Sequence, residues 1–119
     1  MYRIPADLDL SPAVGESTTQ IRVGRHDLHF AFGPVHFAVQ SPIRLFRDGR
    51  LVASWEGGRW PPPDFYDVMD AEVRRWRIPD DRRVVLELAN GIEIHLEDDA
   101  DEHECFQITV EGRPSPWII

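Results

Sequence analysis

The residues best suited to chemistry form an acidic run close to the end of the chain. Six of the eight positions 97–104 carry a carboxylate, namely Glu97, Asp98, Asp99, Asp101, Glu102 and Glu104. A calcium loop of the EF-hand type is not predicted, because the run lacks the interior glycine, the regular ligand spacing and the flanking helices. Two interpretations remain: a surface that binds a basic protein partner, or a solvated connecting loop whose charges also protect a sheet edge.

Histidines provide a second candidate site. In the hairpin predicted below, His29 and His36 project from the polar face as diagonal neighbours on adjacent strands, a placement that suits two metal ligands. The hairpin lacks a third ligand, for which His26 is the nearest candidate. We therefore predict no bound metal and no cofactor, and keep a small ligand or a metal on the His29/His36 face as an alternative.

Other patterns do not identify a reaction. Five arginines cluster in the second half: Arg74, Arg75, Arg77, Arg82 and Arg83. Acidic residues surround them, so we expect ion pairs within or between molecules and no binding of nucleic acid. The tryptophans are expected to pack in the core or in connectors, not to cage a ligand; they are Trp55, Trp60, Trp76 and Trp117. No nucleophile elbow or phosphate-binding glycine loop is found in the sequence, so no catalytic residue and no enzymatic activity are predicted.

The charge balance limits the classes of partner. The chain of 119 residues has a net charge of −8, and all 13 of its basic residues are arginine. Residues 1–60 hold 7 Arg and 6 acids (net +1), whereas residues 61–119 hold 6 Arg and 15 acids (net −9). An acidic half repels nucleic acid and anionic membrane and favours basic partners. The sequence contains no apolar run of membrane-spanning length and no signal-peptide pattern, which favours the cytoplasm.

The elements that must position these residues follow from a pattern that occurs twice. Residues 14–39 and 68–96 carry the same apolar pattern at an offset of about 55–57 residues. In the first copy, 28–32 and 35–39 alternate apolar and polar residues on either side of Gly33-Pro34. This pattern predicts a tight hairpin with six apolar side chains on one face.

The second copy allows two registers. A two-residue turn at Asn90-Gly91 would oppose Leu88 to Glu93 and mix the two faces. A three-residue turn that includes Ala89 opposes Leu88 to Ile92 instead, and all six apolar side chains again share one face. We therefore predict the second register, with Gly91 in a left-handed bulge.

The remaining elements are short. Residues 43–47 and 50–55 flank Asp48-Gly49, a strong hairpin signal. Residues 56–63 predict a stiff proline-rich connector, and Asp64 is expected to cap a short helix over 65–70. Ser11 could cap another short segment, with Pro12 at its first position. Further strands are expected at 19–23, 71–78 and 104–110.

Two features near the end of the chain are expected to be buried. The tail at 117–119 is predicted to dock back on the molecule, because three exposed large apolar residues at a terminus would be unusual. Cys105, the only cysteine, excludes an internal disulfide and is expected in the core.

These elements predict the fold class. We expect one domain over 1–119, all-β, in which the two antiparallel hairpin repeats pack as a sandwich or partly open barrel with one or two short helices. The apolar faces of the repeats must cover each other, and a pseudo-twofold relation between the halves is expected.

The sequence also resembles a group of small bacterial proteins common in actinobacteria, some of which look like immunity proteins encoded beside polymorphic toxins. The residues that carry the resemblance are 40–45, 86–94, the acidic run leading into 104–108, and the terminal 117–119. The resemblance implies an all-β, non-enzymatic protein and transfers no catalytic residue.

Three functional hypotheses follow. The first is an immunity or antitoxin-like inhibitor that covers the cationic cleft of a basic partner, such as a nuclease toxin, with carboxylates from 97–104. The second is a structural module that forms a homodimer through edge strands or exposed aromatic residues. The third is a small ligand- or metal-binding protein that uses the His29/His36 face.

Overall fold

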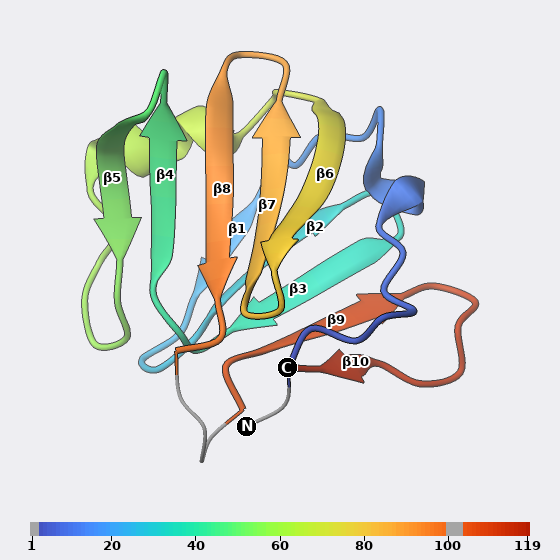
Figure 1. Cartoon of the computed structure of the whole chain (residues 1–119). Helices are drawn as coiled ribbons and strands as arrows, with labels where there is room; N and C mark the ends of the chain where they lie inside the picture. The colour runs from blue at the N-terminus through green and yellow to red at the C-terminus, as the bar shows by residue number, and fades with distance from the viewer. Residues whose placement is uncertain (1–2, 100–103) are drawn as a thin grey trace.

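The protein is all-β, as the sequence predicted, and its two five-stranded antiparallel sheets pack face to face (Figure 1). The computed structural model describes residues 3–99 and 104–119. The first sheet has the order β1-β2-β3-β9-β10, and the second has the order β5-β4-β8-β7-β6. The strands are β1 (Ile21–Val23), β2 (Leu28–Phe32), β3 (Val35–Val39), β4 (Ile43–Arg47), β5 (Arg50–Trp55), β6 (Val73–Asp80), β7 (Arg83–Leu88), β8 (Ile92–Glu97), β9 (Phe106–Val110) and β10 (Trp117–Ile118).

The predicted register of the first hairpin is confirmed. Phe32 lies opposite Val35 and Phe30 opposite Phe37 in the β2–β3 pair. Gly33 adopts the positive φ of 59° that the tight turn needs. The inward side chains of both strands are buried, and the rings of Phe30 and Phe37 stack with centroids 4.9 Å apart.

The register of the second hairpin is confirmed as well. In the β7–β8 pair, Leu86 lies opposite Ile94 and Val84 opposite Leu96. Gly91 takes a φ of 89°, the left-handed conformation expected for the bulge. The period-two apolar pattern therefore selected the right turn where the turn sequence alone suggested another.

After each of the two hairpins, the next two strands of the chain join the opposite sheet. β4 follows β3 in the chain but pairs with β8, and β9 follows β8 but pairs with β3. The two sheets consequently have equivalent strand orders. In the second sheet, read from β6, the strands β6, β7 and β8 take the places of β1, β2 and β3, and β4 and β5 take the places of β9 and β10. Each sheet is complete only when the other half supplies two strands. This order agrees with the pseudo-twofold relation, while a duplicated origin of the halves stays a prediction.

Buried side chains from both sheets form one core. The cluster extends from Ile4 to Ile119 and includes Cys105, which is 2% exposed, as predicted. The tail docks as expected: Trp117 and Ile118 pair with β9, and Ile119 is fully buried. The indole N–H of Trp117 also donates a hydrogen bond to Asp7 at 3.2 Å.

Two predicted caps are wrong. The short helix η2 (Pro63–Val68) is a 3-10 helix that begins before Asp64, with Pro62 at its N-cap position. Its start is set by Pro63, whose fixed φ suits the first helical turn. Ser11 likewise lies inside the 3-10 helix η1 (Ser11–Ala13) and does not cap it.

Asp9, which lies shortly before η1, has a lowered pKa. Its carboxylate accepts a hydrogen bond from the backbone N–H of Ser11 at 3.0 Å. Hydrogen bonds from the side chain and backbone of Ser11 hold the pKa of Asp9 below its usual value.

Two strands are shorter than predicted. β1 begins at Ile21 and β9 at Phe106. Among the described residues, no helix has the length and apolar character needed to cross a membrane.

Candidate functional site

The acidic run follows β8 and precedes β9 in the chain, and the end of β8 lies at the lower end of the sandwich in Figure 1. Asp101 and Glu102 lie outside the described residues. Glu97 ends β8, and its carboxylate makes an ion pair with Arg44 at 2.7 Å. Glu104 lies just before Cys105 and is half-buried.

Asp98 is not on the surface, which corrects the expectation that it would face a partner. It is 2% exposed. One oxygen of its carboxylate lies 3.7 Å from the guanidinium of Arg3, and the other lies 3.5 Å from Sγ of Cys105. The physical reason is local: the backbone N–H of Asp98 donates to the carbonyl of Arg82 at 2.7 Å, which turns this side chain toward the core. The carboxylate of Asp98 is therefore buried against other residues of the protein and does not face a partner.

Asp99 is exposed and lines a hollow that the sequence did not predict. The hollow has a volume of about 280 Å³ and is lined by Asp80, Asp81, Arg82, Arg83, Glu97, Asp98 and Asp99. The lining holds five carboxylates and two guanidiniums, and two more arginines pair with lining carboxylates: Arg44 with Glu97, and Arg3 with Asp81 and Asp98. The hollow is thus an opening that suits a cationic group.

Strand pairing explains how distant residues meet in this hollow. Arg83 at the start of β7 lies opposite Glu97 at the end of β8. Asp80 at the end of β6 and Asp81 in the turn that follows therefore reach the same end of the sheet as Asp99. The β7–β8 register, which the sequence predicted, places the start of β7 beside the end of β8 and so brings this turn next to Glu97.

Arginines offset part of the negative charge around this hollow. Arg3 contacts Asp81 at 3.5 Å as well as Asp98. The backbone N–H of Arg82 donates to the carboxylate of Asp80 at 2.9 Å. Asp80, Asp81 and Asp99 nevertheless remain exposed to solvent.

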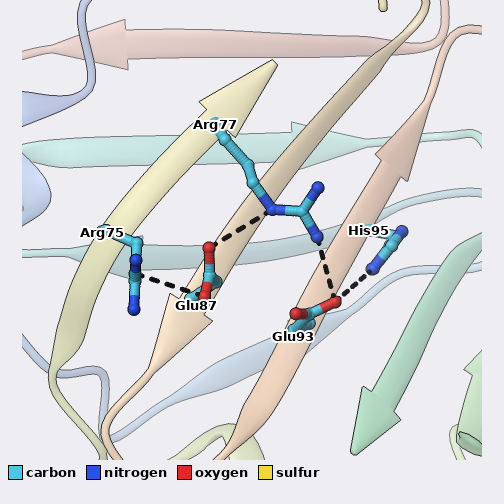
Figure 2. Close-up of polar contacts among 5 residues, drawn as sticks. All are labelled: Arg75, Arg77, Glu87, Glu93 and His95. Atoms are coloured by element: carbon cyan, nitrogen blue, oxygen red, sulfur yellow. Dashed lines mark hydrogen bonds and ion pairs between the residues drawn. The ribbon is translucent and has the colours of Figure 1, made fainter. Parts of the chain in front are cut away.

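A second polar cluster lies on the outer face of the second sheet, where Figure 2 shows its five side chains. Arg75 contacts Glu87 at 3.3 Å, and Arg77 joins Glu87 at 3.2 Å to Glu93 at 3.3 Å. Glu93 also contacts the imidazole of His95 at 3.0 Å. The expectation of intramolecular ion pairs is therefore confirmed for Arg75 and Arg77, whose charges are matched by neighbours on the adjacent strands.

The histidine face has the predicted register. His29 lies opposite Ala38 and His36 opposite Ala31, so the two imidazoles are diagonal neighbours. They line a groove of about 320 Å³ together with Arg22. Each imidazole has a nearby carboxylate: Asp27 lies 2.9 Å from His29, and Glu111 lies 3.5 Å from His36.

The predicted third ligand does not join this pair. His26 is exposed in the turn between β1 and β2 and does not line the groove. Across residues 3–99 and 104–119, no three His, Cys, Asp or Glu side chains are grouped in a way that could hold a metal ion.

Comparison of the chain with protein-family models, with curated proteins and with solved structures found no match. The resemblance to immunity proteins therefore stays a prediction.

Proposed function

We propose that this protein is a non-enzymatic binding protein of the immunity or antitoxin type, which holds a basic partner protein at its acidic end. One observation carries the proposal: the exposed carboxylates of Asp80, Asp81 and Asp99 line one hollow, in which the two lining arginines are only partly exposed. Such a lining favours a cation from the partner over an anion.

The size of the hollow favours a side chain over a complete small molecule. Its volume of about 280 Å³ lies just below the range of roughly 300–1,000 Å³ that is usual for ligand pockets. An arginine side chain fits this description, because its planar guanidinium forms paired hydrogen bonds with carboxylates. Asp80, Asp81 and Asp99 supply exposed carboxylates in this lining to accept these bonds.

The charge of the whole chain supports the same partner. A net charge of −8 accelerates the encounter with a cationic protein, and this acceleration weakens as salt is added. A basic toxin whose cationic cleft must be covered is a partner with this chemistry. The acidic end would then attract the basic partner and bind one of its arginine side chains.

The first experiment uses a fluorescent peptide of alternating arginine and glycine as the probe, with binding followed by anisotropy at low salt. The variant Asp80→Asn/Asp81→Asn/Asp99→Asn should bind at least about tenfold more weakly, a loss of ~1.4 kcal/mol. The matched control is Glu16→Gln/Asp48→Asn/Glu72→Gln, which changes three exposed carboxylates elsewhere. It should change the affinity by less than about twofold, because removing distant charges alters only a screened, long-range interaction.

Equal losses in the two triple variants would reject the acidic hollow, because only the overall charge would then matter. The second stage applies the same variants to a basic protein recovered with this chain from the source cells. There the hollow variant should slow association at low salt. An unchanged association rate would contradict the proposal even if the peptide result agreed.

A further inference from the structure

Two exposed aromatic residues lie in the segment that joins β5 to β6. Trp60 is 83% exposed and Tyr66 is 71% exposed, the two highest values among the large apolar side chains described. The expectation that Trp60 would pack in its connector is therefore wrong. Trp60 lines three hollows, so these hollows adjoin one another around its side chain.

The largest of these hollows is an apolar groove of about 390 Å³. It lies between strand β1 and the segment that leads into η2, and is lined by Ile21, Val23, Trp60, Pro61, Pro62, Pro63, Phe65, Tyr66 and Met69. Exposed aromatic side chains beside an apolar groove are typical of protein interfaces, where tryptophan and tyrosine supply much of the binding energy.

The groove is held in shape before any partner arrives. The three prolines have restricted backbone angles. The indole N–H of Trp55 donates to the carbonyl of Arg59 at 3.0 Å, and the N–H of Gly58 donates to the carbonyl of Arg25 at 2.7 Å. These bonds tie the connector to β5 and to the β1–β2 turn, which lowers the entropy cost of docking.

The surface around Trp60 carries charges of both signs. Arg25 and Arg59 line the hollow on one wall of Trp60. Asp64 and Asp67 are exposed on η2, the element that supplies Phe65 and Tyr66 to the groove. Charges of both signs give this surface no preference for a basic or an acidic partner, whereas a copy of the same surface offers each charge its opposite.

We propose that this face binds a second copy of the chain in a two-fold arrangement. Trp60 of each copy would enter the apolar groove of the other, and the arginines of one copy would meet Asp64 and Asp67 of the other. A two-fold axis requires a self-complementary patch of this kind. This interface shares no residue with the acidic hollow, so it does not rest on the proposed function.

Sedimentation velocity from low to high micromolar concentration tests the proposal. The protein should shift from monomer to dimer, and Trp60→Ala should weaken dimerisation by at least about tenfold, as expected for a hot-spot residue. The control is Ile118→Ala, a truncation of an exposed apolar residue on the distant edge strand β10, which should leave the dimer unchanged. A monomer at every concentration, or equal effects of the two substitutions, would overturn the proposal.

A charge-reversal pair separates a specific interface from a folding defect. Arg25→Asp/Arg59→Asp and Asp64→Arg/Asp67→Arg should each be monomeric alone, because like charges then meet across the axis. An equimolar mixture should dimerise, since every charge again faces its opposite. Failure of the mixture to dimerise, with both variants folded by circular dichroism, would contradict the two-fold arrangement.

Discussion

At the scale of single residues, the acidic run separates into side chains with different roles. Asp98 and Asp99 are neighbours in the sequence, yet one is 2% exposed and the other is exposed to solvent. The buried carboxylate lies against Arg3 and Cys105, while the exposed one borders the acidic hollow. The same residue type therefore supports the fold at one position and is available to a partner at the next.

Replacing Asp98 tests the structural role. Asp98→Ala should lower the free energy of unfolding by about 1–3 kcal/mol, because it removes a buried carboxylate from its neighbours. Urea denaturation followed by fluorescence measures the loss. Asp99→Ala is the adjacent control and should change stability by no more than ~0.5 kcal/mol. An unchanged free energy of unfolding in Asp98→Ala would show that this carboxylate makes no net contribution to stability.

At the scale of elements, turns decide which face of each strand is buried. Asp48 and Gly49 both have positive φ, at 53° and 78°, as expected for the two-residue turn between β4 and β5. Gly91 has a φ of 89° in the longer turn between β7 and β8. Each turn fixes a register, and the register fixes the apolar face.

Gly91→Ala isolates the backbone contribution. An added Cβ would meet only the side chain of Arg47, at 3.9 Å, so no clash is expected. The left-handed backbone should still cost roughly 1–2 kcal/mol for a residue with a side chain. Thermal unfolding measures this loss. The control is Gly57→Ala, a position without positive φ where the new Cβ would have only an ordinary contact at 3.4 Å; a larger loss in the control would contradict the explanation.

At the scale of the whole molecule, strand exchange makes the two sheets depend on each other. β4 and β5 complete the sheet that contains β8, and β9 and β10 complete the sheet that contains β3. The buried residues of both sheets belong to one cluster. We therefore expect the two sheets to unfold together.

Phe37→Ala tests this expectation. Phe37 is 1% exposed and stacks on Phe30, so its truncation should cost about 3–5 kcal/mol. Unfolding in urea should remain one transition, with tryptophan fluorescence and circular dichroism coinciding. Thr109→Val, an exposed position on β9 of the same sheet, should change stability by less than ~0.5 kcal/mol. Separate transitions in the Phe37→Ala variant would show that the sheets unfold independently.

The sequence by itself determined most of the local structure. Alternating apolar residues identified the strands of both hairpins, and the same alternation chose the turn at Ala89-Asn90-Gly91 over the shorter one. This information is local, because the period of two and the turn geometry act over a few residues. The helix caps were the local features missed, since Pro63 set the start of η2 in place of Asp64.

Only the tertiary structure decided which polar residues meet. The β6–β7 and β7–β8 pairings bring Asp80 and Asp81 into one hollow with Asp99, while contacts with Arg3 and Cys105 hold Asp98 at 2% exposure. Trp60 is exposed on the connector, although the tryptophans were expected to pack in the core or in connectors. Apolar periodicity gives the inward face of a strand, but the burial of a side chain at a strand end depends on contacts with residues far apart in sequence, such as that between Asp98 and Arg3. Contacts of this kind decide which carboxylates and aromatic side chains stay exposed to a basic partner or to a second copy.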